Sequence, residues 1–186
     1  MPRPPLLRKL AGEPGRVGRV ALVACSKVKL TPAQIERRPH QLDIFRPVGR
    51  HAVPAQELYQ GQLFTLSRAW LEERRPGQEW AILSAKHGLV LPEQMIEPYD
   101  LALGDLTWEQ QKRWGQRVRA QLAELWGLDD VIYLVLAGEV YRHHLHLPMS
   151  EDVFGHWARQ RKERGTRGRM GIGVLKQMLK RRASYP

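Results

Sequence analysis

Three short apolar segments constrain the fold of this chain more than any other feature. They cover residues 19–25 (RVALVAC), 80–84 (WAILS) and 130–136 (DVIYLVL). An almost unbroken apolar run of this length is typical of a strand that is buried on both faces of its sheet. Segments with helical patterns lie between the three runs. This alternation predicts an α/β fold of three layers, with a mainly parallel central sheet flanked by helices.

The segments between the runs carry helical periodicity. Residues 54–74 are expected to form one helix with an inner face of Leu58, Leu63, Leu66 and Trp70. The pair Pro76 and Gly77 ends this pattern.

The second helix is expected at residues 107–126. Thr107 and Gln110 form a capping box at its start, and Gly127 closes it. Its expected inner face consists of Trp108, Gln111, Trp114, Val118, Leu122 and Leu125.

The rest of the chain shows weaker patterns. Residues 27–53 are interpreted as a long loop with a short helix at 32–37, and residues 85–105 as a segment with little regular structure. A helix is expected to begin at 140–145, and residues 173–182 indicate a short amphipathic helix. Right-handed crossovers would place the carboxyl ends of the three strands at one edge of the sheet, where ligands bind in such folds.

The basic charge is concentrated at the two ends of the chain. The net charge is +11; residues 1–19 carry five basic residues and one acid, and residues 153–186 carry ten basic residues and one acid. We therefore expect a basic arm at 1–18, an α/β domain at 19–150 and a basic helical extension at 151–186. A nucleic acid, with DNA favoured over RNA, is the expected partner, because each neutralised phosphate releases a counterion. The alternative is a solvated, solubilising tail. The expected backbone contacts are Arg159, Arg161, Lys162, Arg164, Arg167 and Arg169.

The composition bears on the expected cellular compartment, cofactors and metal sites. The chain of 186 residues has one cysteine, so it has no internal disulfide, which fits the reducing cytoplasm. No apolar run reaches membrane-spanning length, and the first residues lack the apolar stretch of a signal peptide. We expect a cytoplasmic protein without a membrane partner. Neither a Walker loop nor a dinucleotide fingerprint is present, and we expect no cofactor. His143, His144 and His146 do not share one helical face, so we expect no metal site.

Polar residues follow each apolar run where the strand is expected to end. The three loops begin with Ala24-Cys25-Ser26-Lys27, Ser84-Ala85-Lys86-His87-Gly88 and Ala137-Gly138-Glu139-Val140-Tyr141. Each starts with small residues, which let a ligand approach the backbone closely. Three such loops at one sheet edge predict a ligand site.

Each candidate residue has a functional and a structural interpretation. Lys86 would hold a phosphate or act as a base, and Asp100 would activate water; their alternatives are a surface lysine and a turn aspartate. Tyr99 would stack on a base or simply pack, and His87 is either a general base or a structural histidine. Cys25 is better explained as a small buried thiol, because no partner is spaced for a catalytic dyad.

We place the candidates in two groups. The catalytic group is Asp100, Lys86 and Ser84. The substrate-binding group is Cys25, Ser26, Lys27, His87, Gly88, Tyr99, Gly138 and Tyr141.

Several of these blocks together resemble the YaaA peroxide-stress proteins. The residues are ILSAKHGLV (82–90) followed by IEPYD (96–100), with AGEVY (137–141) and VACSK (23–27) in the places of that family's other blocks. The match is closer still to a family of uncharacterised domains that share Leu-Ser-Ala-Lys-x-Gly-Leu and Pro-Tyr-Asp motifs. The chain is shorter than a typical YaaA protein, and that family's helix-hairpin-helix has no counterpart here. The resemblance implies a nucleic-acid-binding α/β protein linked to damage protection, and a related domain in tRNA-modifying enzymes has been compared with uracil-DNA glycosylases.

Three functional hypotheses follow. The first is a nucleobase N-glycosidase in DNA repair, whose pocket would hold an extruded base, with Asp100 orienting water, Lys86 and Lys27 holding phosphates, and Tyr99 or Tyr141 stacking on the base. The second is a non-catalytic DNA-binding stress protein. The third is a component of tRNA modification, which would prefer folded RNA.

Overall fold

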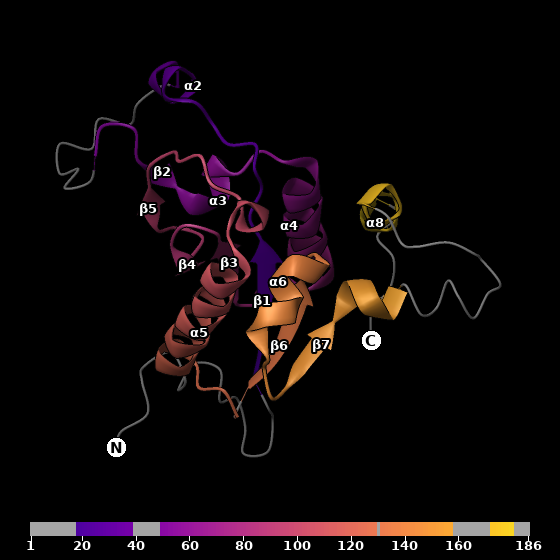
Figure 1. Cartoon of the computed structure of the whole chain (residues 1–186). Coiled ribbons are helices and arrows are strands. Elements are labelled where there is room, and N and C mark those ends of the chain that lie inside the picture. Colours follow the sequence, from indigo (N-terminus) through magenta and orange to yellow (C-terminus); the bar gives the residue numbers. More distant parts are fainter. Residues whose placement is uncertain (1–17, 39–48, 130, 158–171, 181–186) are drawn as a thin grey trace.

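A computed structural model describes residues 18–38, 49–129, 131–157 and 172–180 of the chain (Figure 1). The expected basic arm at 1–18 falls almost entirely outside these residues. The expected phosphate contacts Arg159, Arg161, Lys162, Arg164, Arg167 and Arg169 lie outside them as well. In the described part of the chain, no helix is both long and apolar enough to cross a membrane.

A five-stranded sheet lies at the centre of the fold, and three of its strands are the predicted apolar runs. Its order is β4-β3-β1-β6-β7, with β1 at Gly18–Ala24, β3 at Trp80–Ser84 and β6 at Val131–Leu136. The pairs β1–β3, β1–β6 and β6–β7 are parallel. The fold is therefore α/β, with a mostly parallel sheet flanked by helices, and this prediction is confirmed.

Two further strands extend the sheet at its edges. β4 (Gly88–Val90) runs antiparallel to β3 and forms a hairpin with it, so the expectation of little regular structure at 85–105 was wrong at this point. Gly88 has φ +79°, a left-handed conformation that glycine adopts without strain and that allows the tight return. β7 (Ser150–Asp152) was not predicted, because three polar residues give no strand pattern.

Alternate residues of each strand enter two separate cores, because side chains of a strand point to opposite faces. In β1, Ala21 and Val23 belong to one core, and Val20 and Leu22 belong to the other. All four are buried, which explains the unbroken apolar run.

One face of the sheet is covered by α4 (Gln62–Arg74) and α8 (Ile172–Lys180), which contact each other. Residues 153–157 are helical and lie in the same core, where the rings of Trp70 and Trp157 are 5.8 Å apart. The core therefore continues past residue 150, where the sequence indicated the end of the α/β domain.

The helix expected at residues 54–74 is divided. α3 (Ala55–Leu58) is separated from α4 by residues 59–61, and Tyr59 has an extended backbone that pairs with Lys29 in an isolated bridge. The single-helix prediction was wrong because this pairing takes Tyr59 out of the helix. The buried face of α4 is Phe64, Ser67, Trp70 and Leu71, whereas Leu63 and Leu66 are only half-buried.

The other face is covered by α5 (Trp108–Leu125) and α6 (Glu139–Leu145). The capping box of Thr107 and Gln110 is present as predicted. Trp108 is an exception to the predicted face: at the first turn of the helix it is 56% exposed, with its ring beside Lys112 and His144. At Gly115 the two helices approach so closely that an added Cβ would lie 2.1 Å from the carbonyl oxygen of His144.

Short elements complete the fold, and three of them, α2, β2 and β5, lie at the upper left of Figure 1. α2 (Pro32–Glu36) begins with a capping box at Thr31 and confirms the short helix predicted there. β2 (Val53–Pro54) and β5 (Met95–Ile96) form a small antiparallel sheet, and η1 (Leu103–Asp105) is a 3-10 turn that precedes α5.

Candidate functional site

Polar side chains from five segments meet at the carboxyl edge of the parallel sheet. We define the strand-edge cluster as Cys25, Tyr59, Ser84, Tyr99 and Tyr141. The Cys25 thiol directly after β1 lies 3.3 Å from the Tyr141 hydroxyl of α6, and the Tyr99 hydroxyl lies 3.9 Å from the same sulfur. Parallel strands bring Cys25, Ser84 and Tyr141 together because the carboxyl ends of β1, β3 and β6 share one edge. The sequence predicted four of the five members.

The Tyr99 hydroxyl is the centre of the network. It is hydrogen-bonded to the Tyr59 hydroxyl at 2.9 Å and to the Ser84 hydroxyl at 2.8 Å. Burial raises the pKa of Tyr59 to about 12 and raises the pKa of Tyr99 and Tyr141 further. All three phenols therefore keep their protons at neutral pH, and each hydroxyl is available as both donor and acceptor.

Ser84 has a positioning role in this structure. Its side chain is fully buried, and its hydroxyl accepts a hydrogen bond from the backbone N–H of His87 at 3.1 Å besides its bond to Tyr99. Its carbonyl accepts from the indole N–H of Trp114 at 2.8 Å. A hydroxyl so enclosed does not reach a substrate, so Ser84 holds the turn and orients Tyr99.

Two ammonium groups lie over the Tyr99 ring. The Lys29 Nζ is 4.2 Å from the ring centroid, and the Lys86 Nζ is 5.5 Å from it. Neither lysine forms an ion pair with a carboxylate in the described part of the chain. Burial lowers the pKa of Lys29, with the charge of Asp100 acting against the shift. The site therefore carries two cations that have no carboxylate ion-pair partner among the described residues.

His87 completes the surroundings of Tyr99. Its ring makes an edge contact with the Tyr99 ring at 5.3 Å, and its Nε2 atom is buried without a hydrogen-bond partner among the described residues. Burial, together with the positive charges of Lys86 and Arg117, lowers the pKa of His87. The imidazole is therefore neutral at physiological pH.

The remaining predicted site residues lie around the cluster without joining its hydrogen bonds. Asp100 and Lys27 are exposed. Ser26 is used structurally, because its hydroxyl donates to the carbonyl of Val28 and accepts from the N–H of Gly61. Gly88 forms the hairpin turn, and Gly138 is the N-cap of α6 with open space beside it.

Sequence reasoning missed two residues of the site, Tyr59 and Lys29. Their backbones pair with each other in the isolated bridge, which brings the ring and the ammonium to Tyr99. Tyr59 was hidden by the prediction of one continuous helix. Lys29 is separated from the end of β1 by a short loop. The prediction chose Lys27, two residues earlier, instead.

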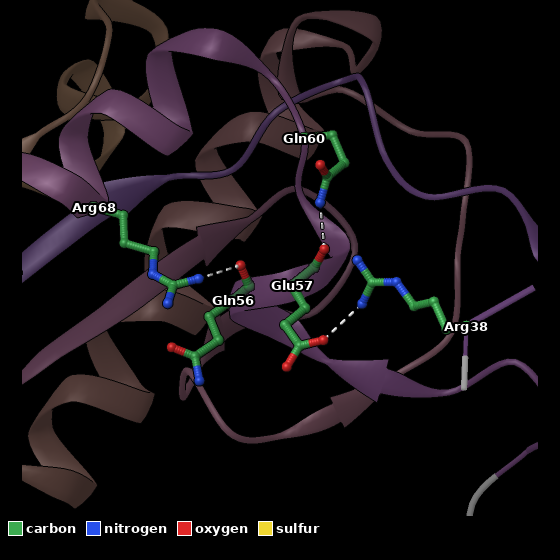
Figure 2. Close-up of polar contacts among 5 residues, drawn as sticks. All are labelled: Arg38, Gln56, Glu57, Gln60 and Arg68. Carbon is green, nitrogen blue, oxygen red and sulfur yellow. Dashed lines mark hydrogen bonds and ion pairs between the residues drawn. The ribbon is translucent and has the colours of Figure 1, made fainter. Parts of the chain in front are cut away.

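A hollow of about 350 Å³ lies beside Tyr59. We call it the arginine hollow; it is lined by Arg38, Gln56, Glu57, Tyr59, Gln60, Phe64, Thr65, Arg68, Ala69 and Glu72. Figure 2 shows Arg38 directed at the Glu57 carboxylate, 2.6 Å away, and Arg68 directed at the Gln56 carbonyl at 3.2 Å. The Nε of Arg68 also donates to Glu72 at 2.6 Å. The guanidinium groups of Arg38 and Arg68 are therefore both paired with carboxylates already.

The three histidines of α6 and its C-cap do not form a metal site. His143 and His144 contact each other with ring centroids 4.9 Å apart, and the His144 Nε2 is bonded to Gln111 at 3.0 Å. Among the described residues, no group of histidine, cysteine and acidic side chains is arranged to hold a metal ion.

The strand-edge cluster lies within the part of the chain that defines its family. A family of unknown function, DUF6884, matches residues 20–157, and the chain belongs to it. No curated protein matches the chain. The family match does not bear on the resemblance to YaaA proteins, which stays a prediction.

Proposed function

We propose that this member of the DUF6884 family binds nucleic acid at the strand-edge cluster and removes a base there as an N-glycosidase. The observation that carries the proposal is the setting of Tyr99, whose ring lies beside two ammonium groups that no described carboxylate neutralises. A nucleotide offers the matching features, a flat base and an anionic phosphate. The net charge of +11 supports a polyanion rather than a free nucleotide.

Different residues of the site would bind different parts of the nucleotide. Lys29 and Lys86 would hold phosphates on either side of the target nucleotide. The half-buried rings of Tyr99 and His87 would contact the base, which is extruded from its stack to reach the sheet edge.

The reaction requires a group that acts at the sugar. Asp100 follows Tyr99 directly and is exposed, so its carboxylate is accessible to a bound substrate. It would orient the water that attacks C1′ and stabilise the positive charge that develops on the sugar ring. The bond from C1′ to the base breaks, the base leaves with the electron pair, and the water oxygen takes its place. Asp100 accepts the proton that the water loses, and the departing base takes up a proton from solvent. Ser84, which is fully buried, is assigned to positioning rather than to catalysis.

A cleavage screen tests the proposal. Labelled oligonucleotides that each carry one damaged or modified base are incubated with the protein, treated with alkali and separated on a denaturing gel. We expect strand breaks with at least one substrate, and Asp100→Asn should lower the rate about 10²- to 10⁴-fold without loss of binding.

The matched control is Glu97→Gln, which removes an exposed carboxylate three residues away. It should leave the rate unchanged. Binding without product for every substrate would reject the glycosidase and favour the non-catalytic binder. A preference for folded RNA over DNA would favour the tRNA-modifying component instead.

A further inference from the structure

We propose, as a step that rests on the nucleic-acid site above, that the Lys29 amine forms an imine with the aldehyde of an abasic sugar and so cleaves the strand after base removal. Asp100 is the only group that the proposed hydrolysis needs near C1′. In that reaction the Lys29 amine serves only as a cation that binds phosphate. The structure gives three reasons to assign it a covalent role.

The first reason is the place of the Lys29 amine. Its backbone is fixed by the bridge to Tyr59, and its Nζ lies 4.2 Å from the centroid of Tyr99 and 5.8 Å from that of Tyr59. It is therefore held over the centre of the site. Lys86, by contrast, is exposed and lies further from the Tyr99 ring.

The second reason is the absence of a carboxylate partner. The hydrogen bond recorded for the Lys29 Nζ goes to the neutral carbonyl of Lys27, at 3.3 Å. In the described part of the chain, no ion pair holds this amine in its protonated form. An amine without an ion pair is easier to deprotonate, and only the neutral amine is a nucleophile.

The third reason is the effect of burial. The half-buried position lowers the pKa of Lys29, so the neutral amine is more abundant than in an ordinary surface lysine. The titratable groups around it are Cys25, Lys27, Tyr59, Tyr99, Asp100 and Asp105.

The reaction is balanced without any added oxidant or reductant. The neutral amine adds to C1′ of the ring-opened sugar, and water leaves as the protonated imine forms. A base removes a proton from C2′, and the bond from C3′ to its oxygen breaks, with the phosphate leaving with the electron pair. Hydrolysis of the imine then returns the Lys29 amine and releases an unsaturated aldehyde at the strand end.

Reductive trapping tests the inference independently of base removal. The full chain is mixed with an oligonucleotide that already contains one abasic site, in the presence of sodium cyanoborohydride, which reduces the imine to a stable amine. We expect a covalent protein–DNA band on a denaturing gel, and peptide mapping should place the modified amine at Lys29.

Two variants separate charge from nucleophilicity. Lys29→Arg keeps the positive charge and cannot form an imine, so it should retain binding and lose the covalent band to background. Lys112→Arg, on α5 outside the strand-edge cluster, should keep the band. Peptide mapping on the unaltered protein identifies the modified amine even if a variant fails to fold.

The outcomes distinguish this inference from the proposed function. Binding without a covalent band, or an adduct mapped to Lys86 or to the terminal amine, overturns the role of Lys29. Base release from a damaged oligonucleotide together with that result would leave the N-glycosidase standing. A Lys29 adduct without base release from any substrate would support the imine step and reject the glycosidase.

Discussion

The strand-edge cluster and the arginine hollow share Tyr59 but differ in whether their cations are paired with carboxylates. In the hollow, Arg38 and Arg68 are bound to Glu57 and Glu72 at 2.6 Å. At the cluster, Lys29 and Lys86 lie over Tyr99 without a carboxylate among the described residues. A phosphate that enters the hollow must compete with a carboxylate already in place. We therefore expect an anion to bind at the cluster, where the cations have no paired carboxylate, rather than in the hollow.

The largest expected effect comes from removing the cations of the cluster. The double variant Lys29→Met, Lys86→Met should weaken binding to a single-stranded oligonucleotide by about 3 kcal/mol, because each charge-assisted bond to phosphate contributes about 1.5 kcal/mol or more. Its salt dependence should also become shallower by about one unit of slope per lysine. Fluorescence anisotropy at several salt concentrations measures both quantities.

The matched control is the double variant Arg38→Gln, Arg68→Gln in the hollow. It removes the same number of positive charges from groups that are already paired, and its effect on affinity should be much smaller. An equal loss in both variants would show that binding depends on total charge alone and would remove the distinction between the two regions.

A smaller effect is expected on stability, from two buried serines. Ser84 in the cluster has a hydroxyl with hydrogen-bond partners, whereas the hydroxyl of Ser67 in α4 is buried without one among the described residues. Ser84→Ala should lower the free energy of unfolding by about 1–3 kcal/mol, because the polar groups around it lose a partner. Ser67→Ala should be neutral or stabilising. Urea denaturation compares them, and a larger loss for Ser67→Ala would contradict the assigned network.

The smallest effect is a change in the pH dependence of binding. Because the pKa of Lys29 is lowered, its charge is lost at a lower pH than that of an ordinary lysine as the pH rises. Affinity should therefore fall first through Lys29 in alkaline solution, by about 1.5 kcal/mol. Lys29→Arg should keep its affinity over the same range, since guanidinium remains protonated. Identical pH profiles for the two proteins would show that Lys29 does not contact phosphate.

Imine formation should respond to pH in the opposite direction. The covalent step needs the neutral amine, so the rate of reductive trapping should rise as the pH increases through the pKa of Lys29, while affinity falls. A single residue that produces both trends would connect the binding site with the proposed covalent step.

The parts of the fold that follow from local patterns were predicted from the sequence. The continuous apolar runs located β1, β3 and β6, because strands buried on both faces have no polar alternation. The capping box at Thr107 located the start of α5. Because the carboxyl ends of parallel strands share one edge of the sheet, the sequence also predicted that Cys25, Ser84 and Tyr141 lie together.

The parts that depend on pairing between distant segments were not predicted. The bridge between Lys29 and Tyr59 joins residues from distant segments, and no local sequence pattern at either residue predicts this pairing. The polar strand β7 forms because β6 offers it an open edge. The sequence also identified Ser84 without revealing that its hydroxyl is fully enclosed, which depends on the packing of Tyr99 and Trp114 around it.

Photo-crosslinking measures most directly whether nucleic acid occupies the strand-edge cluster. An oligonucleotide that carries 5-iodouracil is bound to the full chain and irradiated, and the crosslinked peptide is identified by mass spectrometry. The account predicts an adduct at Tyr99 or His87, and its loss in the Lys29→Met, Lys86→Met variant. Adducts confined to the arginine hollow or to the basic ends of the chain would contradict it.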